Sequence, residues 1–178
     1  MQKPCCLSEL LSYAADKYAD KDFCRFTVSG TLHTRSYREF VSDSSAVCNF
    51  IRSRTPEALH IAFISKTSYE YITCLTGMIL SGNTVVPFSP EISCEEAEML
   101  FRDADIDILF CEEDFSDKAL LIKEAYPALK EIISLGDREF FRDIFEKYNT
   151  DSIYKQPDPD NISLIIYTSG TTGVRKGV

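Results

Sequence analysis

Residues 162–178 read ISLIIYTSGTTGVRKGV, and three kinds of chemistry follow one another along them. An apolar run suited to a buried strand passes directly into a loop of hydroxyls and glycines: Thr168, Ser169, Gly170, Thr171, Thr172, Gly173 and Gly177. Arg175 and Lys176 add two cations near its end. Glycines let a backbone approach a ligand closely, and successive N–H groups in such a turn bind anions. With hydroxyl donors and an ammonium group, the stretch suits the oxygens of a polyphosphate.

Two other interpretations of this loop have to be compared with a phosphate site. Clusters of Gly, Ser and Thr are common in ordinary loops, but here four hydroxyl residues and three glycines fall within residues 168–177. A Walker A loop, counted from Gly170, would need glycine at position 175 and Ser or Thr at position 177. Arg175 and Gly177 break that pattern, so the spacing excludes a P-loop NTPase.

Residues 167–178, YTSGTTGVRKGV, resemble the phosphate-loop signature of the adenylate-forming enzymes. That superfamily contains acyl-CoA synthetases, peptide-synthetase adenylation domains and luciferases. Its usual signature has proline immediately before the lysine, where this chain has Arg175. The change removes a fixed φ angle and adds a cation.

The resemblance extends more loosely over the rest of the chain. Residues 34–40 resemble the early Thr-Tyr-x-Glu-Leu box of the family, and residues 64–71 resemble its strand-to-helix turn. Residues 77–90 resemble its helix, glycine turn, Val-Pro strand and proline exit. The boxes at 67–71 and 81–83 look most like those of bacterial long-chain acyl-CoA synthetases.

The resemblance implies a two-step reaction in which a carboxylic acid and ATP give an acyl-adenylate, and a thiol, most often coenzyme A, then displaces AMP. By the same resemblance, the β- and γ-phosphate oxygens are held by Thr168, Ser169, Gly170, Thr171, Thr172 and Gly173. Lys176, the expected catalytic residue, and Arg175 would neutralise the departing pyrophosphate. Magnesium is implied too, held by acidic residues beyond Val178, so no metal ligand is expected within this chain.

Composition limits the class of protein. A net charge of −9 argues against a nucleic-acid surface and against bulk attraction to anionic membranes. Seven cysteines without a C-x-x-C pair favour buried thiols in a reducing compartment. With neither a signal peptide nor an apolar run of about 20 residues, we expect a cytoplasmic protein without a membrane segment. The two histidines, His33 and His60, lack the spacing of a metal site.

The apolar pattern predicts an α/β fold. Helices are predicted at 8–17, from Ser36 to before Pro56, and at 68–81, 95–103, 116–125 and 138–148; strands are predicted at 59–64, 84–87, 106–110, 131–135 and 162–167; a hairpin is predicted from 23–28 and 31–34, and a linker at 154–161. Strands alternating with helices indicate a doubly wound, mostly parallel sheet with flanking helices, plus a short N-terminal β-hairpin. In such sheets ligands bind beyond the carboxyl ends of the strands.

Residues 1–178 are therefore interpreted as the N-terminal part of a large AMP-binding domain, in the manner of an acyl-CoA synthetase. The rest of that domain and a small C-terminal lid domain are expected elsewhere in a longer protein, and the 178 residues alone are expected to be inactive. Two alternatives stay open: an amino-acid adenylation domain of peptide-synthetase type, and a non-catalytic pseudo-ligase or interaction module, at which only Arg175 hints. The particular acid, the thiol acceptor and the oligomeric state are also open.

Overall fold

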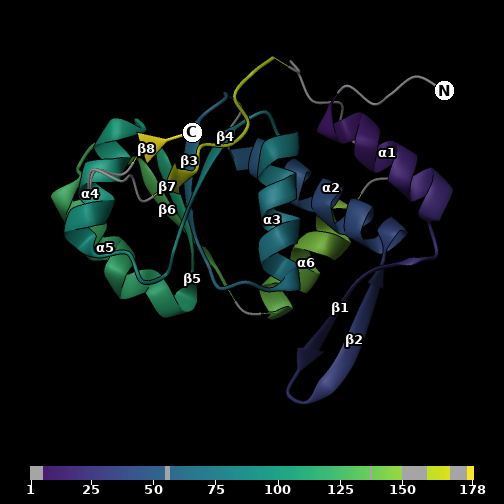
Figure 1. The fold of residues 1–178 in the computed structure, drawn as a ribbon. Helices are drawn as coiled ribbons and strands as arrows, with labels where there is room; N and C mark the ends of the chain where they lie inside the picture. The colour runs from purple at the N-terminus through teal and green to yellow at the C-terminus, as the bar shows by residue number, and fades with distance from the viewer. Residues whose placement is uncertain (1–5, 55–56, 137, 150–159, 169–175) are drawn as a thin grey trace. The chain divides into compact units, whose positions relative to one another are not determined.

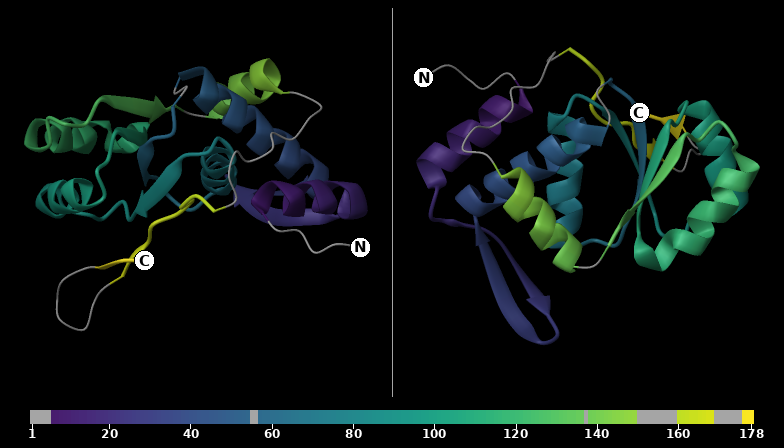
Figure 2. Two further views of the ribbon diagram at one scale, coloured as in Figure 1. Left: turned by 90° about the horizontal axis from the view of Figure 1, so that it is seen from above. Right: turned by 180° about the vertical axis from the view of Figure 1, so that it is seen from behind.

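The chain forms two compact units in the computed structural model. The structure describes residues 6–54, 57–136, 138–149, 160–168 and 176–178. The first unit is drawn from the described residues within 1–56, 67–82 and 142–161, and the second from those within 57–66, 83–141 and 162–178. Figure 1 shows the elements of both, and Figure 2 shows them from two further sides.

A parallel four-stranded sheet is the centre of the second unit. Its strands are β3 (His60–Ile64), β4 (Thr84–Phe88), β5 (Ile108–Glu112) and β6 (Glu131–Leu135). The order across the sheet is β4-β3-β5-β6, and every neighbouring pair is parallel. The chain therefore steps outward from β3 to β4 and then returns past β3 to β5. That reversal is typical of a doubly wound sheet and confirms the predicted α/β class.

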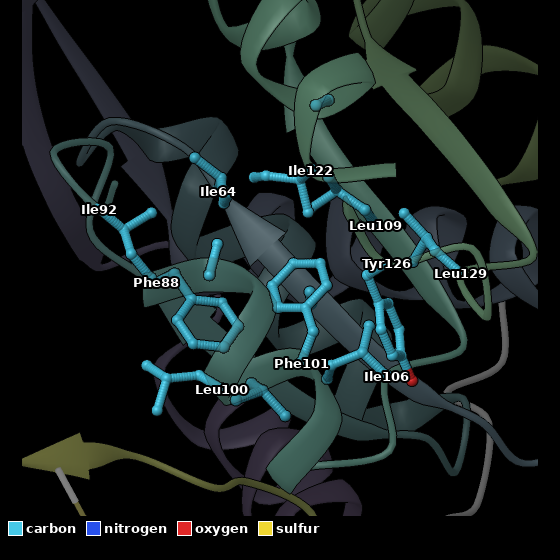
Figure 3. Close-up of a cluster of buried hydrophobic side chains, with 14 of the residues drawn as sticks. Ile64, Phe88, Ile92, Leu100, Phe101, Ile106, Leu109, Ile122, Tyr126 and Leu129 are labelled. Atoms are coloured by element: carbon cyan, nitrogen blue, oxygen red, sulfur yellow. The ribbon is translucent and has the colours of Figure 1, made fainter. Parts of the chain in front are cut away.

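Helices α4 (Cys94–Asp103) and α5 (Ser116–Ala125) cover one face of this sheet (Figure 1). Figure 3 shows the side chains packed between them and the strands: Ile64, Phe88, Ile92, Leu100, Phe101, Ile106, Leu109, Ile122, Tyr126 and Leu129. Phe101 is fully buried, with its ring centroid 5.3 Å from that of Phe88 and 6.1 Å from that of Tyr126. The near-continuous apolar sequence of β3 and β5 matches this burial, since strands of a covered parallel sheet lack a polar face.

The first unit joins helices to the predicted hairpin. Its elements are α1 (Leu7–Tyr18), β1 (Asp22–Val28), β2 (Thr31–Ser36), α2 (Tyr37–Arg54), α3 (Tyr69–Leu80) and the C-terminal part of α6 (Arg138–Tyr148). The antiparallel hairpin extends away from the helices (Figures 1 and 2). Ser29 and Gly30 form its two-residue turn at φ +48° and +80°, as a tight hairpin turn of this kind requires. Leu11, Phe40 and Leu80 are buried in this unit's own core.

Predicted helix ends are visible as hydrogen bonds. The Ser36 N–H donates to Glu39 Oε2 (2.7 Å) and the Glu39 N–H donates to Ser36 Oγ (3.2 Å), which confirms the predicted capping box. Ser68 and Ser93 cap α3 and α4, each accepting from a backbone N–H three residues later at 3.0 and 3.1 Å. Gly82, at φ +88°, ends α3 as predicted.

Strand β5 begins two residues later than predicted. We expected residues 106–110, whereas β5 runs from Ile108 to Glu112. The Ile106 N–H donates to the carbonyl oxygen of Phe101 (3.0 Å), and Asp105 takes φ +49°, so Ile106 belongs to the turn that follows α4. The short 3-10 helix η1 (Glu113–Phe115) then connects β5 to α5 and was not predicted.

Candidate functional site

The apolar run before the loop continues the sheet only partially. The Val85 N–H donates to the Ser163 carbonyl (3.0 Å), and the Ile165 N–H donates to the Val85 carbonyl (2.9 Å). These bonds form a single parallel bridge between Val85 and Leu164 beside β4. Ile162 is 66% exposed, so the prediction of a buried strand over 162–167 is wrong. Residues 163–165 lie beside β4, the outer strand of the sheet, and pair with it on one side.

The described ends of the loop meet as an antiparallel pair, β7 (Tyr167–Thr168) and β8 (Lys176–Gly177). Tyr167 lies opposite Gly177 and Thr168 lies opposite Lys176. The flanking residues, Ile166 and Val178, exchange N–H···O bonds of 2.9 and 3.0 Å. This pairing was not predicted from the sequence.

Side chains alternate across β7 and β8. Thr168 and Lys176 are both exposed and, being directly opposite, share one face, so the structure brings together the predicted hydroxyl and the predicted ammonium. The other predicted site residues lie outside the described residues: Ser169, Gly170, Thr171, Thr172, Gly173 and Arg175. A hydroxyl donor and a cation on one face are suited to binding anionic oxygens.

Aromatic packing places β7 at the carboxyl end of β4. The ring of Tyr167 stacks on Phe88, the last residue of β4, with centroids 6.1 Å apart and planes inclined by 16°. The Tyr167 hydroxyl donates to Asp103 Oδ2, at the end of α4 (2.5 Å). The loop therefore begins at the carboxyl ends of the strands, where doubly wound folds bind their ligands.

A second polar cluster lies at the carboxyl ends of β3 and β5. The hydroxyl of Ser65 and the backbone N–H of Lys66 both donate to Glu112 Oε1, the latter at 3.1 Å. Lys66 Nζ pairs with Asp114 Oδ2 at 2.6 Å. Neither Glu112 nor Asp114 was predicted as a site residue. The only signal for this cluster is that polar residues directly follow two apolar strands.

The reactive side chains of His60, Cys48 and Cys111 are hydrogen-bonded or buried in the protein core. His60 Nδ1 donates to the Ala104 carbonyl oxygen (2.6 Å), at the amino end of β3. Burial raises the pKa of the Cys48 thiol to about 12 and that of Cys111 to about 11. Among the described residues, no group of three or more His, Cys, Asp or Glu side chains is arranged to hold a metal. None of the helices within the described ranges is long and apolar enough to cross a membrane.

Comparison with known proteins shows the family of the chain. The sequence matches the family described as "AMP-binding enzyme" over residues 11–178. It is 28% identical to the "Probable CoA ligase CCL8" of Humulus lupulus, over 80% of this chain and 29% of that protein. It is 30% identical to "Surfactin synthase subunit 1" of Bacillus subtilis, over 82% of this chain and 4% of that protein.

The fold is also that of a solved structure. A long-chain-fatty-acid-CoA ligase (FadD1) from Archaeoglobus fulgidus matches with a TM-score of 0.81 at 17% identity, over 100% of this chain and 37% of that one. The chain spans less than a third of the length of the curated relatives it matches first. Given a family match from residue 11 to residue 178 and the signature at 167–178, the chain belongs to the AMP-binding family of adenylate-forming enzymes.

Proposed function

We propose that the whole protein to which these residues belong activates a carboxylic acid with ATP and passes the acyl group to a thiol. The observation that carries the proposal is the pairing of Thr168 with Lys176, at the carboxyl end of β4 and at the base of the signature loop. Membership of the adenylate-forming family supports the same reaction.

In the proposed reaction a carboxylate oxygen attacks the α-phosphorus of ATP. The bond to the bridging oxygen breaks, and pyrophosphate leaves with that pair of electrons. Lys176 would neutralise charge on the leaving group, and the Thr168 hydroxyl on the same face would donate to a phosphate oxygen. Ser169, Gly170, Thr171, Thr172, Gly173 and Arg175 would supply the remaining donors, as the signature implies. A thiolate then attacks the acyl carbon of the adenylate and AMP leaves.

Magnesium would accompany ATP, bound to its phosphate oxygens and offsetting their charge. The described residues contain no group of three acidic, histidine or cysteine side chains that fits the ion. As the resemblance implies, acidic residues beyond Val178 in the whole protein would hold the ion.

We propose long-chain fatty acids as the substrate class and coenzyme A as the acceptor. The fold match to FadD1 and the boxes at 67–71 and 81–83 support this choice. Amino-acid adenylation is the second candidate, because the surfactin synthase subunit is 30% identical over 82% of this chain. Buried thiols at Cys48 and Cys111 support a reducing compartment, the cytoplasm.

ATP–pyrophosphate exchange by the whole protein tests this proposal. Acids from acetate to palmitate, amino acids and aryl acids are supplied one at a time, and a reaction without acid gives the background. We expect exchange that increases with acyl chain length. Exchange with amino acids alone would transfer the proposal to the peptide-synthetase type. A folded protein that binds ATP but exchanges with no acid would contradict adenylation and favour the non-catalytic pseudo-ligase.

A further inference from the structure

Tyr167 makes the described contacts that connect the hairpin β7–β8 to α4 and to the carboxyl end of β4. Its ring lies against Phe88 on one side. On another side it lies over Gly177, where an added Cβ would come within 3.4 Å of both Cε1 and Cζ of the ring. The same Cβ would be 3.0 Å from Cγ2 of Ile165, closer than an ordinary van der Waals contact. The tyrosine ring therefore packs against β8 at Gly177, and the tight contact of an added Cβ would be with Ile165 rather than with the ring.

The hydroxyl of Tyr167 adds a hydrogen bond to these packing contacts. It donates to Asp103, the last residue of α4, and the neighbouring Phe101 is fully buried in the core of the second unit. Burial, the hydrogen bond to Asp103 and the charge of that carboxylate all raise the pKa of Tyr167. The phenol thus stays protonated and donates at every pH at which the protein would work.

The position of Tyr167 also determines where the exposed residues Thr168 and Lys176 lie. Thr168 follows it in the chain, and Lys176 precedes Gly177, which lies opposite Tyr167. Two strands of two residues are marginal by themselves in water, so their pairing needs support from the body of the unit. When that support is lost, a smaller fraction of molecules holds Thr168 and Lys176 side by side.

We propose that Tyr167, through Asp103 and the packing against Phe88 and Gly177, is a positioning residue for the ATP phosphates. The proposal rests on the proposed function, because it assumes that Thr168 and Lys176 bind those phosphates. Tyr167 touches no reacting atom. It raises the fraction of molecules in which the hairpin is competent to bind ATP, and apparent affinity scales with that fraction.

The test uses four single variants of the whole protein and one double variant, assayed by ATP–pyrophosphate exchange. Tyr167→Phe keeps the ring and removes the hydroxyl, Asp103→Ala removes the acceptor, and Asp103→Asn keeps an acceptor oxygen. The matched control is Tyr69→Phe, because the Tyr69 hydroxyl donates to Asp43 Oδ2 (2.6 Å) within the first unit, so it removes a similar bond far along the chain from the loop.

For Tyr167→Phe and Asp103→Ala we expect the KM for ATP to rise about fivefold, as for loss of one hydrogen bond, with kcat within about twofold of wild type. Combining them should add little, because both remove the same bond. Asp103→Asn should recover part of the affinity, and Tyr69→Phe should lower the melting temperature without changing KM. An unchanged KM in Tyr167→Phe, with a melting temperature lowered as in Tyr69→Phe, would show a purely structural role and overturn the proposal.

Amide hydrogen exchange at Ile166 and Val178 separates this inference from the proposed function. These two amides report the pairing of β7 with β8 directly. Should the whole protein show no exchange of pyrophosphate, the proposed function fails, and the amides still decide on Tyr167. Amide exchange about fivefold faster in Tyr167→Phe supports the positioning role of Tyr167, and an unchanged rate overturns it.

Discussion

Replacing Gly77 with alanine sets helix propensity against helix packing in the first unit. Gly77 lies inside α3, where alanine is favoured over glycine by about 1 kcal/mol when nothing obstructs it. Here the added Cβ would be 2.6 Å from Cβ and Cγ1 of Val47 and 2.9 Å from the carbonyl oxygen of Ser44, both on α2. The two effects have opposite signs, so the measured sign tests the described packing.

The size of the packing term follows from which atoms clash. Carbon atoms in contact normally lie about 3.5–4.0 Å apart, so α2 and α3 would have to separate by roughly 1 Å. Neither the Cβ of a helical valine nor a backbone oxygen can rotate away. We therefore take the upper part of the range for overpacking, about 3 kcal/mol, which leaves a net loss of about 2 kcal/mol for Gly77→Ala. In a chain of this size, that lowers the melting temperature by about 4–8 °C.

Thermal and urea unfolding followed by circular dichroism measure this loss. Val47→Ala in the same chain should restore less than half of it, because the Cβ of residue 47 and the oxygen of Ser44 remain. Gly136→Ala is the comparison: the three atoms nearest to its Cβ would all belong to the side chain of Phe140, the closest at 3.0 Å, and the substitution should cost about 1 kcal/mol or less. A Gly77→Ala variant as stable as wild type, or more stable, would refute the described packing of α2 on α3.

Two further predictions concern titratable groups. Burial alone would raise the pKa of Asp107, but hydrogen bonds from Lys130 and from a backbone N–H lower it overall. The charged carboxylate therefore stabilises the fold at pH values above the ordinary pKa of 3.8, and this stabilisation is lost as the pH falls below that value. Asp107→Asn should therefore cost about 0.5–1 kcal/mol in urea unfolding at pH 7 and progressively less below about pH 4; an equal cost at pH 3 would contradict the ion pair. Burial raises the pKa of the Cys48 and Cys111 thiols, so iodoacetamide at pH 8 should label the half-buried Cys94 at least about tenfold faster, as mass spectrometry would show. Labelling of all three at one rate would contradict the described cores.

The order and type of the helices α1–α6 and the strands β1–β6 could be predicted because their signals are local. The apolar spacing of α3 and the capping box at Ser36 involve residues within a few positions of one another. The start of β5 could not be predicted in this way. Ile106 is as apolar as Ile108 and Leu109, and its bond to Phe101 places it in the turn before the strand.

The chemistry of the site could be predicted from sequence, but its support could not. Residue types and spacing identify the loop at 168–177 without any structure. The contact of Tyr167 with Asp103 and that of Ser65 with Glu112 join residues 64 and 47 positions apart, and neither pair forms a local pattern. The bridge at Leu164 likewise depends on Val85, so the pattern of an apolar run gave no sign that it lies at an edge.

The measurement that tests the central claim most directly is the single-turnover rate of acyl-adenylate formation by Lys176→Ala in the whole protein. Lys176 is exposed, so the melting temperature should stay within about 1 °C of wild type. Loss of a preorganised charge beside the departing pyrophosphate should slow adenylation by about 10²–10³-fold. The control is Lys147→Ala, an exposed lysine of α6, which should leave the rate unchanged. Adenylation at the wild-type rate by Lys176→Ala would contradict the assignment of this loop to the phosphates of ATP.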